Sequence, residues 1–187
     1  MIFTETKLAG AYTIEIDPIR DNRGYFARSW SKPDFEERGL NANVVQANVA
    51  ANEEKGTLRG MHFQYSPHAE TKLVRCIRGS VYDVIIDLRH YSETYKQWIG
   101  VELSAANNLM LYVPEGFAHG YQTLVDDTEL SYLTTALYVP YASGGVRYND
   151  TAFQILWPLA VTRISETDAR WEDYRDHPSK PRPPVVI

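Results

Sequence analysis

Short apolar segments separated by polar punctuation run along most of this chain. Each segment is rich in β-branched and aromatic residues and is bounded by Gly, Pro, Asn or Asp. This spacing is typical of strands in an antiparallel sandwich or barrel. The clearest predicted strands are 11–17, 44–49, 72–77, 80–87, 98–103, 109–113 and 130–137.

Turn and helix signals complete an expected all-β fold with a few short helices. The Arg-Gly-Ser run at 78–80 predicts a hairpin turn between two strands. A helix is expected over 31–38, where Pro33 falls in the first turn. A second is expected over 165–174, because Ser165 begins a run that resembles a capping box.

The length of 187 residues predicts a single domain, 1–187, with a proline-rich tail from about residue 177. Four prolines exclude regular helix or inner strand from that tail, so we expect it to lie extended along the surface or across a partner. Apolar residues make up 44% and charged residues 23%, as in ordinary globular proteins. No repeat or low-complexity tract interrupts the pattern.

Charge and targeting signals narrow the classes of function. A net charge of -5 argues against a nucleic-acid-binding protein, because no basic stripe is available to neutralise phosphates. The single cysteine, Cys76, excludes an internal disulfide framework. Neither a signal peptide nor a membrane-spanning apolar run is evident. We therefore expect a cytoplasmic protein without a nucleic-acid or membrane partner.

The first candidate chemistry lies in Gly-Thr-Leu-Arg-Gly-Met-His, residues 56–62, together with Lys72. Arg59, His62 and Lys72 are costly to bury in strands unless something pairs with them, and Arg and Lys are good anion ligands. A lone strand histidine is more often structural, but these neighbours favour a functional role. Strict alternation would separate Arg59 from His62, so we expect a bulge at Gly60 to turn both toward one cavity.

Further candidates have an equally good structural explanation when taken singly. His119 follows Pro-Glu-Gly on a strand face shared with Phe117 and Tyr121, which could be core. Tyr132 could be a half-buried strand tyrosine, and Asp168 could simply cap a helix. Together with His62 and Lys72 they suggest a pocket that binds an anion and moves a proton.

A metal site is the alternative suggested by part of this pattern. Cupin jelly rolls bind metal through a His-x-His pair, a following Glu, and a His after Pro-x-Gly. The last part fits residues 114–119, but Gln64 stands where the second histidine belongs, and Glu70 is rather distant. Gln is a poor ligand for first-row transition metals, and Lys72 would repel a cation. We expect neither a metal nor a cofactor.

Several motifs in order resemble the dTDP-4-dehydrorhamnose 3,5-epimerase family, a metal-free branch of the cupins with a double-stranded β-helix (jelly-roll) fold. They span most of the chain from Arg20 to Asp168, and a chance match is implausible. The motifs are Gln-Ala-Asn at 46–48, 56–64, Thr-Lys-Leu-Val-Arg-Cys at 71–76, Asp-Leu-Arg at 87–89, 113–120, Asn-Asp at 149–150, Ile-Leu-Trp-Pro at 155–158 and Ile-Ser-Glu-Thr-Asp at 164–168.

The resemblance implies inversion of carbon 3, and also of carbon 5, in a dTDP-4-keto-6-deoxyhexose of dTDP-rhamnose-type biosynthesis. His62 matches the family's base, Asp168 the acid that orients it, and Tyr132 the proton donor on the opposite face. Lys72 matches the lysine that neutralises the enolate oxygen. The family is typically a homodimer with strands shared across the interface.

The resemblance implies a set of substrate contacts, and this chain also departs from the pattern. Arg28 and Ser143 stand where the family usually has glutamates, Thr167 replaces a lysine, and Tyr148 replaces a tryptophan. These departures leave the nucleotide and sugar open. The matching substrate-binding positions are Arg23, Phe26, Gln46, Asn48, Arg59, His119 and Tyr138.

Three alternatives remain open from the sequence. A relative could invert a single carbon or use a different nucleotide sugar, since the extent of inversion depends on how the sugar is positioned. A metal-dependent cupin enzyme is a less favoured second. A non-enzymatic sugar- or nucleotide-binding module is the third, and it leaves the combination of His62, Tyr132, Lys72 and Asp168 without a purpose.

Overall fold

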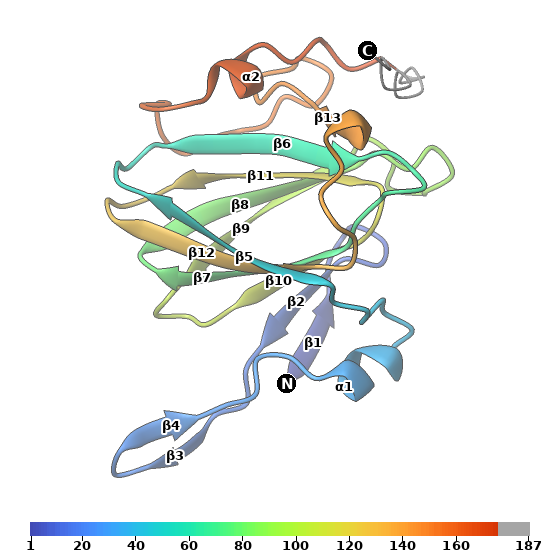
Figure 1. Ribbon diagram of the computed structural model, residues 1–187. Helices are drawn as coiled ribbons and strands as arrows, with labels where there is room; N and C mark the ends of the chain where they lie inside the picture. The colour runs from blue at the N-terminus through green and yellow to red at the C-terminus, as the bar shows by residue number, and fades with distance from the viewer. Residues whose placement is uncertain (176–187) are drawn as a thin grey trace.

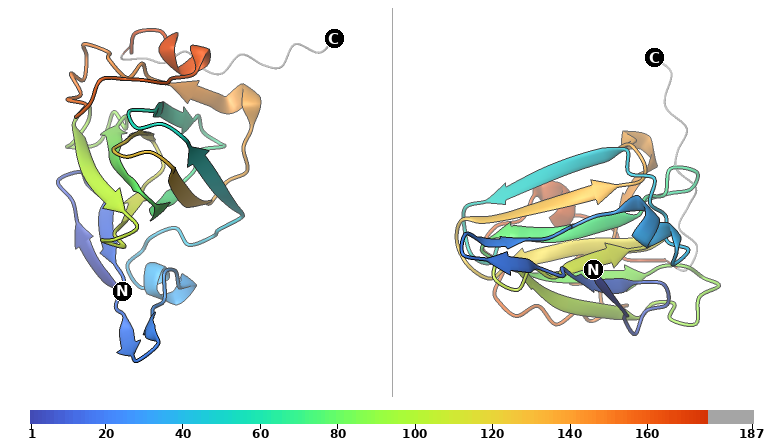
Figure 2. Two further views of the ribbon diagram at one scale, coloured as in Figure 1. Left: turned by 90° about the vertical axis from the view of Figure 1, so that its left-hand side faces the viewer. Right: turned by 90° about the horizontal axis from the view of Figure 1, so that it is seen from below.

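The structure is a computed structural model, and it describes residues 1–175. Two antiparallel sheets face each other in a sandwich, as Figures 1 and 2 show. The six-stranded sheet contains, in spatial order, β1 (Ile2–Glu5), β2 (Tyr12–Glu15), β10 (Met110–Val113), β7 (Lys72–Arg78), β12 (Thr128–Thr134) and β5 (Gln46–Asn52). The five-stranded sheet contains β13 (Ser143–Gly145), β6 (Leu58–Gln64), β11 (Phe117–Thr123), β8 (Ser80–Asp87) and β9 (Trp98–Ser104).

Few other elements occur in the described part of the chain. A small hairpin is formed by β3 (Ile19–Asp21) and β4 (Gly24–Phe26), and two short helices are α1 (Lys32–Glu36) and α2 (Glu166–Ala169). A 3-10 turn, Pro140–Ala142, precedes β13. The predicted all-β jelly roll with a few short helices is confirmed. The single-domain prediction for 1–187 stays a prediction, and the proline-rich tail lies outside the described residues.

Most predicted strands occur with small changes in their ends. The strand over 80–87 has the predicted bounds, whereas 72–77 and 98–103 each continue one residue further. The strands predicted at 44–49 and 130–137 are displaced to β5 and β12, which pair with each other from Thr128↔Asn52 to Thr134↔Gln46. Pairing across the sheet therefore sets their ends more than local composition does.

The core lies between the two sheets, with further apolar clusters on both outer faces. The inner cluster joins residues of both sheets, such as Val74, Leu111 and Leu130 from one and Ile85 and Phe117 from the other. Residues around Phe153 and Ile155 cover the outer face of the five-stranded sheet, and α1 covers the outer face of the six-stranded sheet through Phe35. Figure 1 shows the segment carrying α2 above β6.

The predicted hairpin at 78–80 is wrong. β7 pairs with β10 and β12, whereas β8 pairs with β9 and β11, so the turn links the two sheets instead of two neighbouring strands. Gly79 has a positive φ of 74°, and a Cβ there would lie 2.4 Å from Thr128 Oγ1. The glycine lets the chain cross from one layer to the other at close quarters.

The two helix predictions are right in place but too long. The first, expected over 31–38, is α1, with a proline in its first turn as predicted. The second, expected over 165–174, ends at Ala169, while the Ser165 side chain accepts a hydrogen bond from the Asp168 backbone N–H as expected of a cap. Beyond it the Tyr174 N–H donates to buried Asp150 at 2.6 Å, which draws the chain onto the sheet.

A β-bulge interrupts β6 where it pairs with β11. His62 lies opposite His119 and Arg59 lies opposite Tyr121, so β6 has one more residue than β11 over this stretch. Gly60 has a φ of 125°, and a Cβ there would lie 2.5 Å from the Gly120 Cα. The bulge predicted at this glycine is confirmed, and it brings Arg59 and His62 to one side of the strand.

The β3–β4 hairpin projects from the sandwich as an arm, shown in blue at the bottom of Figure 1. Its large apolar side chains Ile19 and Phe26 are each 72% exposed. Arg23 at its tip bonds Asp21 of the same hairpin and has an 85% exposed side chain. Tyr25 of the arm donates a hydrogen bond to Asn108 Oδ1 of the sandwich at 3.1 Å, whereas Ile19, Arg23 and Phe26 stay exposed.

Candidate active site

A cavity of about 680 Å³ lies between the two sheets, and it gathers most of the predicted functional residues. The five-stranded sheet supplies Arg59 and His62 from β6 and His119 from β11, and the six-stranded sheet supplies residues of β5, β7 and β12. Of the residues predicted for the site, those lining this cavity are Gln46, Asn48, Arg59, His62, Lys72, His119, Tyr132 and Tyr138.

His62 and Asp168 form a hydrogen-bonded pair at the cavity wall. His62 Nε2 lies 2.7 Å from Asp168 Oδ1, although the two residues are 106 positions apart in the chain. The His62 side chain is 43% exposed and that of Asp168 is 7% exposed. Asp168 therefore binds the Nε2 nitrogen of His62, which fixes the tautomer of the ring and leaves Nδ1 for other contacts.

The surroundings of Asp168 keep its carboxylate ionised. Burial by itself favours the neutral acid, but hydrogen bonds from His62, from the Gly60 N–H at 3.1 Å and at Ser165 outweigh it. The net effect is a pKa below the usual value for aspartate. The Gly60 contact also ties this carboxylate to the bulge of β6, so the bulge and the pair support each other.

Tyr132 and Lys72 enter the cavity from the opposite sheet. Tyr132 lies on β12 and Lys72 begins β7, with Lys72 directly opposite Thr134 in the register. Burial is the main cause that raises the pKa of Tyr132, which keeps its hydroxyl protonated. Tyr132 lines the cavity, so its phenolic proton can reach a ligand bound there.

Sequence reasoning missed the role of Glu70. This residue lines the cavity, and its Oε1 lies 3.2 Å from Lys72 Nζ. Both side chains are largely buried, with exposed fractions of 13% for Glu70 and 10% for Lys72. An acid two positions before a lysine is the available signal in the sequence, where the cupin pattern explains Glu70 only as a distant metal ligand.

A second histidine–aspartate pair, also missed in part, lies beside the first. His119 Nε2 is 3.0 Å from both carboxylate oxygens of Asp83, which is fully buried on β8. The acid at position 83 stands within an otherwise apolar strand, and that pattern could have identified it. Asp83 thus orients His119 as Asp168 orients His62.

Polar side chains complete the wall near β5. Arg59 Nε donates to Asn52 Oδ1 at 2.8 Å, which fixes the guanidinium across the gap between the sheets. The Gln46 amide donates to Asn48 Oδ1 at 2.7 Å. Tyr121 also lines the cavity, and burial raises its pKa to about 12. These groups offer several hydrogen bonds and one fixed cation to a bound anion.

Gln64, at the position where a cupin metal site would have its second histidine, is bound by protein groups. Its amide nitrogen donates to the backbone oxygens of His68 and Leu137, and its Oε1 accepts from the Val139 N–H at 2.7 Å. Gln64 thereby holds the loop before Pro140. No group of three or more His, Cys, Asp or Glu residues placed to hold a metal occurs within residues 1–175.

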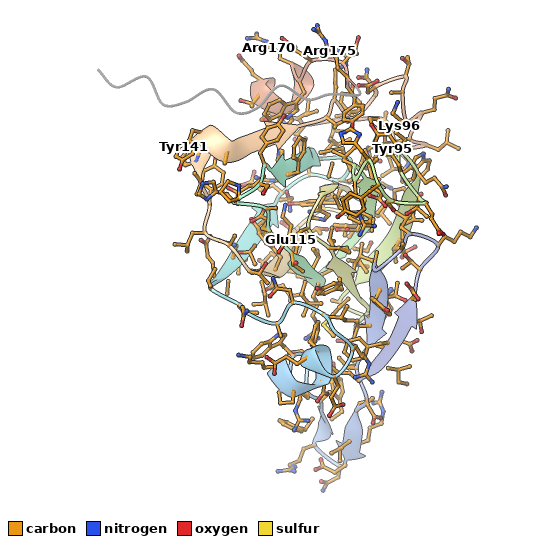
Figure 3. All side chains as sticks on the ribbon, turned by 90° about the vertical axis from the view of Figure 1, so that its right-hand side faces the viewer. Tyr95, Lys96, Glu115, Tyr141, Arg170 and Arg175 are labelled. Carbon is orange, nitrogen blue, oxygen red and sulfur yellow. The ribbon has the colours of Figure 1, made fainter. Side chains whose placement is uncertain are left out.

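The cavity is lined by two of the four positions where the chain departs from the family pattern. Ser143 and Thr167 line it, and the exposed Tyr138 lies at its edge. Tyr141 lies on the outer edge of the molecule, as Figure 3 shows, against His68. Arg28 is exposed and is not among the cavity-lining residues of the described chain.

Arg23 and Phe26, predicted to bind substrate, lie apart from the other site residues. Both are on the projecting β3–β4 arm and neither lines the cavity of this chain. The structure therefore brings together the residues predicted for proton transfer and most of those predicted for substrate binding, but not these two.

No helix in the described part of the chain has the length and apolar character needed to cross a membrane.

Comparison with known proteins identifies relatives of this fold and site. The family model for dTDP-4-dehydrorhamnose 3,5-epimerase matches residues 5–176. The dTDP-4-dehydrorhamnose 3,5-epimerase of Methanothermobacter thermautotrophicus is 41% identical over 179 residues, covering 94% of this chain and 96% of the relative. This identity extends over nearly the full length of both chains.

Solved structures agree with the sequence comparison. The Bacillus anthracis dTDP-4-dehydrorhamnose 3,5-epimerase, with TDP and PPi bound, has a TM-score of 0.89 and 40% identity over 92% of this chain and 99% of its own. A 3'-monoepimerase from Streptomyces bikiniensis, in complex with dTDP-quinovose, has a TM-score of 0.83 and 29% identity over 90% and 85%. The chain belongs to the dTDP-4-dehydrorhamnose 3,5-epimerase family, with its cupin-type jelly roll.

Proposed function

We propose that this protein is an isomerase that inverts carbon 3 and carbon 5 of a dTDP-linked 4-keto-6-deoxyhexose, as in the formation of dTDP-rhamnose. The observation that carries the proposal is the placement of a base and an acid on opposite sheets. His62 belongs to the five-stranded sheet and Tyr132 to the six-stranded sheet, and both line one cavity. Inversion needs a proton removed from one face and returned to the other.

In the proposed reaction, His62 Nδ1 accepts the proton from the carbon beside the ketone. The C–H electron pair moves into the bond between that carbon and the carbonyl carbon, which gives an enolate. Asp168 stabilises the imidazolium that forms, because its ionised carboxylate lies 2.7 Å from Nε2. Tyr132 then donates its phenolic proton to the same carbon from the opposite face, and the ketone re-forms.

Lys72 supplies the electrostatic part of this proposal. An ammonium fixed beside the ketone oxygen stabilises the negative charge that develops on it, and such preorganised charge is often the largest catalytic contribution. The ion pair with Glu70 holds that ammonium at the cavity wall. Arg59 and His119, with Gln46, Asn48 and Tyr138, are proposed to bind the rest of the nucleotide sugar.

The choice of dTDP rests on relatives. The Bacillus anthracis structure holds TDP, and the Streptomyces bikiniensis structure holds dTDP-quinovose. Inversion of a single carbon is the second candidate, because the latter relative is a 3'-monoepimerase. The cytoplasmic location expected from the sequence stays a prediction.

Proton NMR of dTDP-4-keto-6-deoxyglucose incubated with the protein in deuterated water tests the proposed function. We expect deuterium at both carbon 3 and carbon 5, because each inversion passes through an enolate that takes its new proton from an exchangeable group. Deuterium at one carbon would favour the single-carbon epimerase. No deuterium at either carbon, with folded protein, would contradict the proposal for this nucleotide sugar.

We also propose that the protein is a homodimer in which each β3–β4 arm completes the partner's cavity. The support is that Arg23 and Phe26 lie on a projecting arm, exposed and outside their own cavity. An exposed phenylalanine beside an exposed arginine is suited to contact a nucleotide. A twofold arrangement would give two equivalent exchanges of arms.

Mixing two inactive variants tests the exchange of arms. Arg23→Ala damages the arm, and His62→Ala damages the cavity of the other variant. If arms are exchanged, a mixed dimer contains one cavity with neither defect, so co-refolded protein should regain about one quarter of wild-type activity. Activity no greater than the sum of the two variants would place Arg23 in its own cavity or in none.

A further inference from the structure

Glu70 is an unexpected group in a cavity proposed to bind a pyrophosphate and to stabilise an enolate. Its carboxylate adds negative charge where the ligand is already anionic. The side chain is also largely buried, and a buried carboxylate is costly unless it is paired. A role that compensates for this cost should be visible in its contacts.

The contacts of Glu70 point to Lys72 first. Oε1 lies 3.2 Å from Lys72 Nζ, and Oε2 lies 3.5 Å from the amide nitrogen of Gln64. Gln64 is already committed to backbone groups at shorter distances, so the lysine is the main partner. A flexible ammonium at the cavity wall is thereby held in one position before the substrate arrives.

Glu70 also acts on Tyr132 through its charge. Lys72 lies opposite Thr134 in the register, and Tyr132 is two positions from Thr134, so both face the cavity from the same side of the sheet. Burial raises the pKa of Tyr132, the negative charge of Glu70 raises it further, and the positive charge of Arg59 lowers it. The carboxylate therefore favours the neutral phenol.

We propose that Glu70 is a positioning residue for the two catalytic groups that the six-stranded sheet supplies, Lys72 and Tyr132. Its carboxylate fixes the Lys72 ammonium for the enolate oxygen and keeps Tyr132 in the protonated form that donates to carbon. This inference rests on the proposed epimerase function. It assigns Glu70 a contact with Lys72 and a charge effect on Tyr132, and no contact with the reacting atoms.

Other groups lining the cavity also influence Tyr132 and set what a test must separate. The neighbouring strand β5 contributes only uncharged side chains there, such as Gln46 and Asn48. The charged or titratable groups lining the same cavity from the segment before β7 and from the other strands are Glu70, Lys72, Arg59, His62, His119 and Tyr121. Glu70 is the carboxylate in this set, and its negative charge raises the pKa of Tyr132. Removing that charge should therefore lower the pKa of Tyr132.

Three variants of Glu70 separate its charge from its size. Glu70→Gln removes the charge at nearly constant volume, and Glu70→Ala is a second neutral variant if the first fails to fold. Glu70→Asp keeps the charge but shortens the side chain by one methylene. Glu129→Gln is the matched control, because Glu129 is also on the six-stranded sheet but pairs with Arg78 away from the cavity.

The first measurement follows Tyr132 directly by phenolate absorbance, as the difference between each variant and the same variant carrying Tyr132→Phe. We expect the Tyr132 titration midpoint to fall by about one pH unit in the neutral variants, from the loss of one nearby charge at an effective dielectric constant of about 20. Glu70→Asp and Glu129→Gln should keep the wild-type midpoint.

The second measurement is the pH profile of epimerisation. In the neutral variants the alkaline limb of kcat/KM should move to lower pH by the same amount, and kcat should fall about tenfold with KM within about threefold, because Lys72 is no longer fixed. Glu70→Asp should keep the wild-type alkaline limb even where kcat falls.

The two measurements separate this inference from the proposed function. An unchanged Tyr132 midpoint in the neutral variants, or a Glu70→Asp variant that behaves like Glu70→Gln, overturns the role of Glu70. A wild-type protein that exchanges no sugar proton overturns the proposed function instead. In that case the absorbance titration still decides whether Glu70 controls the protonation of Tyr132.

Discussion

Replacing His62 with alanine should abolish deuterium uptake at both carbon 3 and carbon 5 of the sugar. The His62 imidazole is the base oriented by Asp168 at 2.7 Å, and the alanine variant leaves the carboxylate too far back to replace it. Loss of a general base and of its oriented partner costs up to about 10⁴-fold in rate. Integration of the carbon 3 and carbon 5 proton signals in deuterated water measures the loss.

Two other histidines sharpen the interpretation of this variant. His68→Ala is the matched control, because His68 packs against Tyr141 and does not line the cavity, so exchange should stay at the wild-type rate. His119 is the rival base, since Asp83 orients it at 3.0 Å on the neighbouring strand. Exchange that persists at one carbon in His62→Ala and disappears in His62→Ala/His119→Ala would assign that carbon to His119.

Replacing Tyr132 with phenylalanine should uncouple exchange from inversion. His62 can still remove a proton and return a deuteron to the same face, whereas no acid on the opposite sheet completes the inversion. We expect deuterium to enter with the original configuration and net inversion to fall by about 10²- to 10³-fold. The coupling constants of the sugar protons, followed alongside deuterium content, distinguish the two outcomes.

Tyr121 is the competing acid in this cavity, with a pKa raised to about 12 by burial. Its hydroxyl, however, donates to Asn52 Oδ1 at 3.3 Å. Inversion at the wild-type rate in Tyr132→Phe would remove Tyr132 from the acid role, and its loss on adding Tyr121→Phe would transfer the role to Tyr121. Tyr91→Phe is the matched control, because Tyr91 is 87% exposed and its loss should leave inversion at the wild-type rate.

Local pattern places most of the long strands, but it does not give their ends throughout or their pairing partners. The runs of β-branched residues placed the strand over 80–87 with its observed bounds. The hairpin predicted at 78–80 is wrong because a glycine with positive φ suits both a hairpin and a crossing between layers. Which of the two occurs depends on pairing partners far away in the sequence, here β10 and β12 for β7.

The candidate site shows the same division. The glycine at position 60, between two cationic or titratable residues, was enough to predict the bulge that places Arg59 and His62 together. The function of Asp168 followed only from the family resemblance, because its contact with His62 spans 106 positions. The roles of Glu70 and Asp83 were not predicted from the sequence. A carboxylate that orients another side chain differs from a surface carboxylate in its burial and its partner, and residue type shows neither.

The position of Asp168 links the catalytic pair to the outermost layer of the protein. Asp168 belongs to the segment that packs on the outer face of the five-stranded sheet through Phe153 and Ile155, outside the sandwich that holds His62 and Tyr132. Layers of a fold open at different free energies, and peripheral ones open first. Local unfolding of this segment would remove the Asp168 carboxylate from His62 while both sheets stay paired. We therefore expect heat to abolish activity at a lower temperature than the one that unfolds the sandwich.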